Sequence, residues 1–228
     1  MAYSTTTRAT LRTRIRETLL NNFWTDTELN LYINEALRVW NTLTGYFRTS
    51  ASYTIPAATS THSTSTATGS DGWIILRLET TSIHLNPINL AEISSISPGW
   101  WSNTAGTPSS WIPLGLNRFA TDPQPSSGLS HTIDYVRTAP LPTSDSSFIQ
   151  IGEEDMLAII DYVIFISKLK EGGDELAGAQ SSLQNFLKQA AKYNSRLLQI
   201  SSFRTLLGLP MGGQRNLRPD MLDKASVR

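Results

Sequence analysis

The sequence predicts an α+β protein: an antiparallel four-helix bundle formed by one helical hairpin at each end of the chain, with a β-rich insertion and an extended C-terminal tail. Apolar residues recur at helical spacing in 7–44 and 153–200, whereas the stretch between them is rich in Ser, Thr and Pro, which favours strands and turns. Each hairpin has an apolar face that it cannot bury alone, so we expect the two to pack together. The expected parts of the chain are 1–48, 49–152, 153–200 and 201–228.

The first helix is expected over 7–21, where Leu11, Ile15 and Leu19 form an apolar stripe at a spacing of four residues. A second stripe at the same spacing is basic and consists of Arg8, Arg12 and Arg16. A basic stripe of this kind is either a solvated helix face or a face that contacts a neighbouring subunit or nucleic acid.

The second helix has clear start and stop signals. Thr25 and Glu28 have the spacing of a capping box, and Gly45 is a C-terminal stop because Gly enters the left-handed region without steric cost. The loop 22–24 is short, so we expect the first two helices to be antiparallel neighbours.

The middle part is predicted to be a small β-sandwich or barrel. Candidate strands lie at 53–56, 73–79, 82–85, 91–97, 111–118 and 132–136. The Ala/Ser/Thr-rich stretch 57–71 is expected to be a long mobile hairpin loop, because its composition cannot build a core.

The second hairpin consists of helices at 153–170 and 174–200. The first of these has acidic residues in its first turn and Lys168 and Lys170 in its last, as the helix dipole favours, and it is apolar nearly all round. The pair Gly172–Gly173 ends it, and Asp174 is expected to cap the next helix.

The tail is apolar, basic and repeatedly broken by Gly and Pro. Such a segment either frays or docks on a partner, and the close spacing of large apolar residues favours docking. The predicted docking residues are Leu206, Leu207, Leu209, Pro210, Met211, Arg215 and Arg218.

Composition excludes several classes of protein. The 228 residues carry 19 basic and 19 acidic side chains and no Cys, which rules out a polycation, a disulfide scaffold and a thiolate zinc site. No secretory signal is visible, and the most apolar run, 156–166, is too short for a membrane span of about 20 residues. We therefore expect a protein made in the cytosol that has no membrane contact.

No catalytic, cofactor or metal site is predicted. The sequence has no nucleophile elbow, phosphate loop or HExxH motif, and His62, His84 and His131 are scattered through the middle part. The acidic residues at 153–155 point in different directions on a helix, so dipole capping explains them better than a metal cluster does.

The pair Trp100–Trp101 follows a Pro–Gly turn. Exposed aromatic pairs are typical of surfaces that bind sugars or proteins, and the alternative is an aromatic plug over the β core.

The motif Trp24-Thr25-Asp26-Thr27-Glu28-Leu29, followed by Asn34-Glu35-Ala36-Leu37, resembles the opening helices of tailed-bacteriophage head-to-tail adaptor (connector) proteins. The second hairpin and the helix-breaking tail are also similar, while the large Ser/Thr-rich insertion departs from the smallest members. The resemblance implies a non-enzymatic virion protein, made in the host bacterial cytoplasm, that forms a homo-oligomeric and commonly dodecameric ring. Such a ring sits beneath the portal; the C-terminal segment reaches up onto the portal, and the opposite face receives the tail or nozzle protein. Double-stranded DNA passes through the central channel during packaging and ejection, with transient contacts. By analogy, the β insertion would contact tail proteins.

Two other functions stay open. One is a β-rich carbohydrate- or ligand-binding module on a helical stalk, using Trp100, Trp101 and Trp111. The other is a hydrolase with a scattered Ser, His and Asp site.

Overall fold

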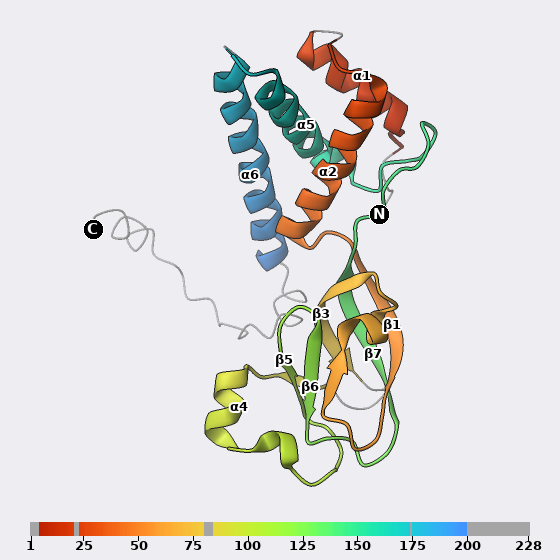
Figure 1. Ribbon diagram of the computed structural model, residues 1–228, viewed down its shortest axis with the longest axis vertical. Coiled ribbons are helices and arrows are strands. Elements are labelled where there is room, and N and C mark those ends of the chain that lie inside the picture. The colour runs from red at the N-terminus through yellow and green to blue at the C-terminus, as the bar shows by residue number, and fades with distance from the viewer. Residues whose placement is uncertain (1–4, 21–22, 80–83, 174, 200–228) are drawn as a thin grey trace, which may run out of the picture.

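The computed structural model describes residues 5–20, 23–79, 84–173 and 175–199, and its fold is α+β. Four helices gather at one end of the molecule, and the strands lie at the other with two short helices (Figure 1). The chain passes between the two parts twice, after α2 and after β7.

Helix α1 (Arg8–Leu19) lies within the predicted range 7–21, and α2 (Asp26–Thr44) begins and ends at the predicted signals. Thr7 caps α1 by accepting a hydrogen bond from the Thr10 amide. Both halves of the predicted capping box form at the start of α2, and Gly45 ends that helix with φ of 56°. These short-range predictions are confirmed because the capping groups lie within a few residues of the backbone groups that they bind.

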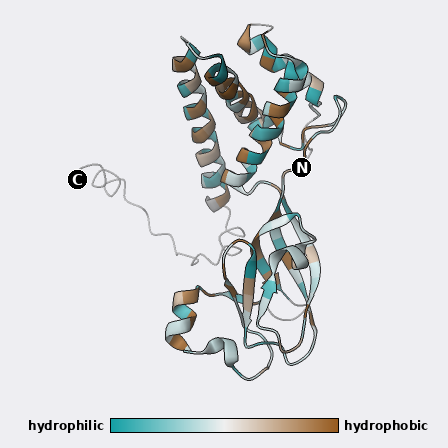
Figure 2. Ribbon diagram, in the orientation of Figure 1, coloured by the Kyte–Doolittle hydropathy of each residue, from teal (hydrophilic) through white to brown (hydrophobic). Residues whose placement is uncertain are grey.

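Helices α5 (Met156–Glu171) and α6 (Glu175–Gln199) form the second helical pair, and a 3-10 turn, η2 (Glu153–Asp155), precedes α5. Gly172 and Gly173 both have positive φ, which confirms the predicted stop. The expected cap Asp174 lies outside the described residues. Figure 2 shows α5 as the most hydrophobic helix, in keeping with its burial on more than one side.

The prediction of an antiparallel four-helix bundle made from two hairpins is wrong. α5 and α6 pack closely, and α5 also contacts α1 and α2, but α1 and α2 share only a small contact. The reason lies in α1, where only Leu11 and Ile15 are buried, and where Arg12 and Arg16 form ion pairs with Asp26 at the start of α2. The helices therefore surround α5 rather than pairing as two equal hairpins.

The β part has two sheets. The first is three-stranded and antiparallel, in the order β1 (Arg48–Ile55), β7 (Leu129–Arg137), β3 (Gly72–Glu79). The second has the order β2 (Thr61–Ser63), β6 (Arg118–Asp122), β5 (Ser110–Pro113), β4 (Asn86–Pro87), in which β4 and β5 are parallel. Buried residues of both sheets form one cluster: Ile55, Leu78, Trp111, Phe119, Ile133 and Tyr135.

Three predictions in the β part need correction. The stretch 57–71 contains β2 and helix α3 (Thr64–Thr68), and the expected strand 91–97 is helix α4 (Leu90–Ile96), capped by Asn89 and followed by the 3-10 turn η1 (Trp100–Ser102). The expected strand 111–118 is divided between β5 and β6 by a turn in which Gly115 has φ of 116°. The stretch 91–97 was ambiguous because Ile93 and Ile96 also have helical spacing. The candidate strand 82–85 lies partly outside the described residues.

Candidate partner-docking surfaces

The basic stripe of α1 is held by carboxylates of the same chain. Asp145 accepts hydrogen bonds from Arg8 at 3.0 Å and from Arg12 at 2.9 Å and 3.0 Å. Asp26 pairs with Arg12 at 3.2 Å and with Arg16 at 2.6 Å. The hydrogen bonds from Arg12 and then Arg8 lower the pKa of Asp145 to about 2.

Through these contacts, the basic stripe holds the segment between β7 and η2 against α1. Main-chain bonds support the ion pairs: the Arg8 amide donates to the Ser147 carbonyl at 2.9 Å, and the Ile149 amide donates to Thr6 at 3.0 Å. The side chains of Arg8 and Arg12 are only 13% and 11% exposed. Of the three arginines, Arg16 therefore has the most surface left for a partner.

We expect Asp145→Asn to lower the melting midpoint of the helical part, because Arg8 and Arg12 would lose their shared carboxylate. The loss should be smaller in about 0.5 M NaCl, since salt weakens the pairs in the parent protein. Because the pKa of Asp145 is lowered, the stabilisation is complete above about pH 4 and is lost as the pH falls toward 2. Calorimetry at two salt concentrations measures the change in melting midpoint, and Asp122→Asn in the β part is the control. If Asp145→Asn lowered the midpoint equally at both salt concentrations, the prediction would be contradicted.

The two tryptophans of the predicted contact pair have different environments. Trp100 is buried against Ile93, Ile112 and Ala120, whereas Trp101 is 60% exposed. Leu90 and Ile96 of α4 are exposed as well, so the segment formed by α4 and η1 carries several apolar side chains at the surface. Trp111 is buried, so of the three tryptophans of the carbohydrate-binding alternative only Trp101 presents a face to solvent.

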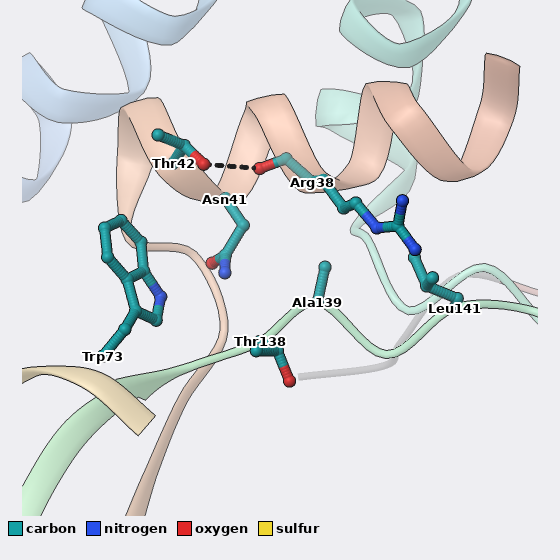
Figure 3. A pocket seen from close by; sticks show the side chains of 7 residues that line it. All are labelled: Arg38, Asn41, Thr42, Trp73, Thr138, Ala139 and Leu141. Carbon is teal, nitrogen blue, oxygen red and sulfur yellow. Dashed lines mark hydrogen bonds between the residues drawn. The ribbon is translucent and has the colours of Figure 1, made fainter. Parts of the chain in front are cut away.

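A cleft of about 440 Å³ lies where the helical part meets the β part (Figure 3). Figure 3 shows α2 along one side of it and the chain that follows β7 along the other, with the Trp73 ring at one end and Arg38 beside Leu141 at the other. Its lining residues are Arg38, Asn41, Thr42, Trp73, Thr138, Ala139 and Leu141.

Asn41 joins the two parts of the molecule at this cleft. Its side-chain amide donates to the Arg137 carbonyl at 2.8 Å, and its oxygen accepts from the Phe47 amide at 2.9 Å. Sequence reasoning missed this residue, although a signal existed: Asn41 lies on the buried face of α2 with Leu37, Trp40 and Thr44. A polar side chain at such a position is usually satisfied by a backbone partner.

The predicted docking tail, which contains Leu206, Leu207, Leu209, Pro210, Met211, Arg215 and Arg218, lies outside the described residues. Its role therefore stays a prediction.

Comparison with protein families decides the class of the molecule. Residues 6–206 match the model of the SU10 adaptor protein family. The chain belongs to the SU10 adaptor protein family. It is thus a bacteriophage adaptor, a structural component of the virion, and the resemblance of its first helices to head-to-tail adaptors is confirmed. No curated protein matches the chain.

Within the described part of this adaptor, no three His, Cys, Asp or Glu residues are grouped so that they could hold a metal ion. Among the described helices, none has the length and apolar character needed to cross a membrane.

Two histidines of the adaptor lie buried in the β part. His62 of β2 stacks near Phe119, with ring centroids 5.1 Å apart, and His131 of β7 contacts the Leu129 carbonyl through Nδ1 at 2.9 Å. Burial, and then the neighbouring His131, lower the pKa of His62 to about 4, and burial lowers the pKa of His131. Both rings are therefore neutral at physiological pH.

We expect a fall in pH to destabilise the β part of the adaptor before the pH is low enough to protonate the carboxylates. Unfolded histidines bind protons below about pH 6.5, whereas buried His62 does so only near pH 4, so the unfolded state gains protons first and stability falls across this window. The loss should be about 1–3 kcal/mol. Denaturant unfolding at several pH values between about 7 and 4 measures this change in the free energy of unfolding. The variant His62→Phe should show a smaller dependence on pH. A free energy of unfolding that does not change with pH in the parent protein would refute the prediction.

Proposed function

We propose that this adaptor is one subunit of a homo-oligomeric ring, of twelve copies, that joins the portal to the tail and forms part of the DNA channel. The observation that carries the proposal is the family match, which spans both helical segments and the β part between them.

Exposed apolar side chains on several helices support ring formation. Leu31 of α2, Leu157 of α5 and Leu187 of α6 are each about half exposed or more in the single chain. Contacts between neighbouring subunits would remove such surface from water. In this proposal α2, α5 and α6 contribute to the faces between copies.

The portal contact is assigned to the C-terminal tail. The apolar run from Leu206 to Met211 would fill portal pockets, while Arg215 and Arg218 would pair with acidic groups at their edge. The β part, with exposed Trp101, is assigned to the tail or nozzle protein.

Weak DNA contact suits a channel protein. The chain has a formal net charge of +0, so it would not grip passing DNA, since each phosphate contact adds salt-dependent affinity. Arg8, Arg12 and Arg16 stay candidates for a subunit or channel face, and their pairing with Asp145 and Asp26 would make any phosphate contact transient.

Electron microscopy of the adaptor co-expressed with its cognate portal tests the proposal. We expect an added ring layer with twelve-fold symmetry beneath the portal, and loss of that layer when the chain is ended after Ser201. The truncated chain should keep its melting midpoint, because every core residue in the described part of the chain precedes the cut. A bare portal with full-length adaptor left free would refute the ring and the docking tail together.

A further inference from the structure

A second cavity, of about 260 Å³, lies in the β part. Trp73 lines both cavities. The other apolar residues of the second cavity include Ile74 and Ile75 from β3 and Trp111, Pro113 and Leu116 from the β5 side. The two cavities, which share Trp73, are here called the β3-edge groove.

The strand beside this groove is the open edge of its sheet. β3 pairs with β7 on one side. On the other side, within the described part of the chain, a backbone bond forms only at its end, where the Leu85 amide donates to the Leu78 carbonyl at 3.1 Å. Among the described residues, no backbone hydrogen bond joins 73–77 to any strand except β7. An exposed edge of this kind is a template for a further strand.

The edge lacks the residues that usually prevent strand addition. Trp73, Ile74, Ile75 and Leu76 are consecutive, apolar and half-buried, with no Lys or Pro among them. The first charged residue is Arg77, whose guanidinium bonds Asp134 at 2.7 Å on β7. The Arg77 side chain is therefore paired within its own sheet.

The charges around the groove indicate the chemistry of its occupant. Arg38 lines the first cavity and Arg118 the second; both are exposed, and neither has an ion pair with a described residue. Of the residues that the structure describes, no Asp or Glu lines either cavity. The chain's own tail fits poorly, because the charges nearest to its apolar run are Arg204 and Arg215, which have the same sign as the groove.

We propose that the β3-edge groove receives an extended segment of a partner protein, in which aliphatic and acidic side chains alternate, as an added strand next to β3. Aliphatic side chains would enter the two cavities, carboxylates would pair with Arg38 and Arg118, and main-chain bonds would form with 73–77. This site goes beyond the proposed function, since it is complete on one subunit and needs neither the ring nor the portal.

Three labelled heptapeptides test the site by fluorescence anisotropy with the full-length chain. The first alternates valine and glutamate, the second alternates valine and lysine, and the third is the first with alternate backbone amides N-methylated. We expect the first to bind at least about tenfold more tightly than the others, since only it supplies both the charges and the strand bonds. Equal binding of all three, or equal binding of the N-methylated peptide, would overturn strand addition.

Charge reversal gives a test that does not depend on stability alone. Arg38→Glu combined with Arg118→Glu should reverse the preference, so that the valine–lysine peptide binds more tightly than the valine–glutamate peptide. Lys188→Glu, on an exposed face of α6 away from the groove, is the matched control and should leave the preference unchanged. If the glutamate peptide binds only to a chain ended after Ser201, the groove belongs to the chain's own tail and the proposal is wrong.

Discussion

Phe186→Ala is expected to reduce the free energy of unfolding of the helical part by about 3–5 kcal/mol, the usual cost of removing a buried aromatic ring. Phe186 of α6 is fully buried, and its ring centroid lies 4.8 Å from Tyr162 of α5 and 5.9 Å from Trp40 of α2. One side chain thus joins three helices, and its loss would leave a cavity where they meet.

The next residue on the same helix is the control. Leu187 is about half exposed, so Leu187→Ala should change the free energy of unfolding by no more than about 0.5 kcal/mol. Urea denaturation followed by circular dichroism measures both variants. Similar losses for the two would contradict the packing of α6 described above.

Gly72→Ala is expected to cost about 1–3 kcal/mol through overpacking in the three-stranded sheet. A Cβ at Gly72 would lie 2.5 Å from the Thr68 hydroxyl and 2.5 Å from Cδ2 of Tyr135. Neither neighbour moves freely, because the Tyr135 hydroxyl bonds the Thr68 carbonyl at 3.2 Å and Asp71 at 3.1 Å. Relief of the clash would require α3 to move away from the start of β3.

Gly128→Ala is the matched control for this substitution. Its Cβ would be 3.6 Å from Thr54, an ordinary van der Waals contact, and Gly128 is not among the glycines with positive φ. Thermal melting of the two variants should therefore show a clear loss for Gly72→Ala and almost none for Gly128→Ala. A Gly72 variant as stable as the parent would show that α3 does not pack on β3 as described.

The candidate surfaces could be predicted only in part. The family was accessible from sequence, because a capping box next to an N-E-A-L run is a local pattern. The tryptophan pair left open whether its rings are exposed or buried, and the structure exposes Trp101 and buries Trp100. The internal pairing of Arg8 and Arg12 was not, since Asp145 lies more than a hundred residues further along the chain. The β3-edge groove was equally hidden, because residues from α2, β3 and β5 meet there only after folding.

The sequence by itself determined the helix ends and the α+β class, because caps, left-handed glycines and apolar periodicity act over a few residues. Thr25, Glu28 and Gly45 needed no distant partner to define α2. Tertiary structure decided how α1 packs, since an arginine stripe is the same in sequence whether it faces water or a carboxylate. It also decided that 91–97 is a helix. Ala91 and Ile93 have strand alternation, whereas Ile93 and Ile96 have helical spacing, and the burial of Ile93 against Trp100 and Ile112 goes with the helix.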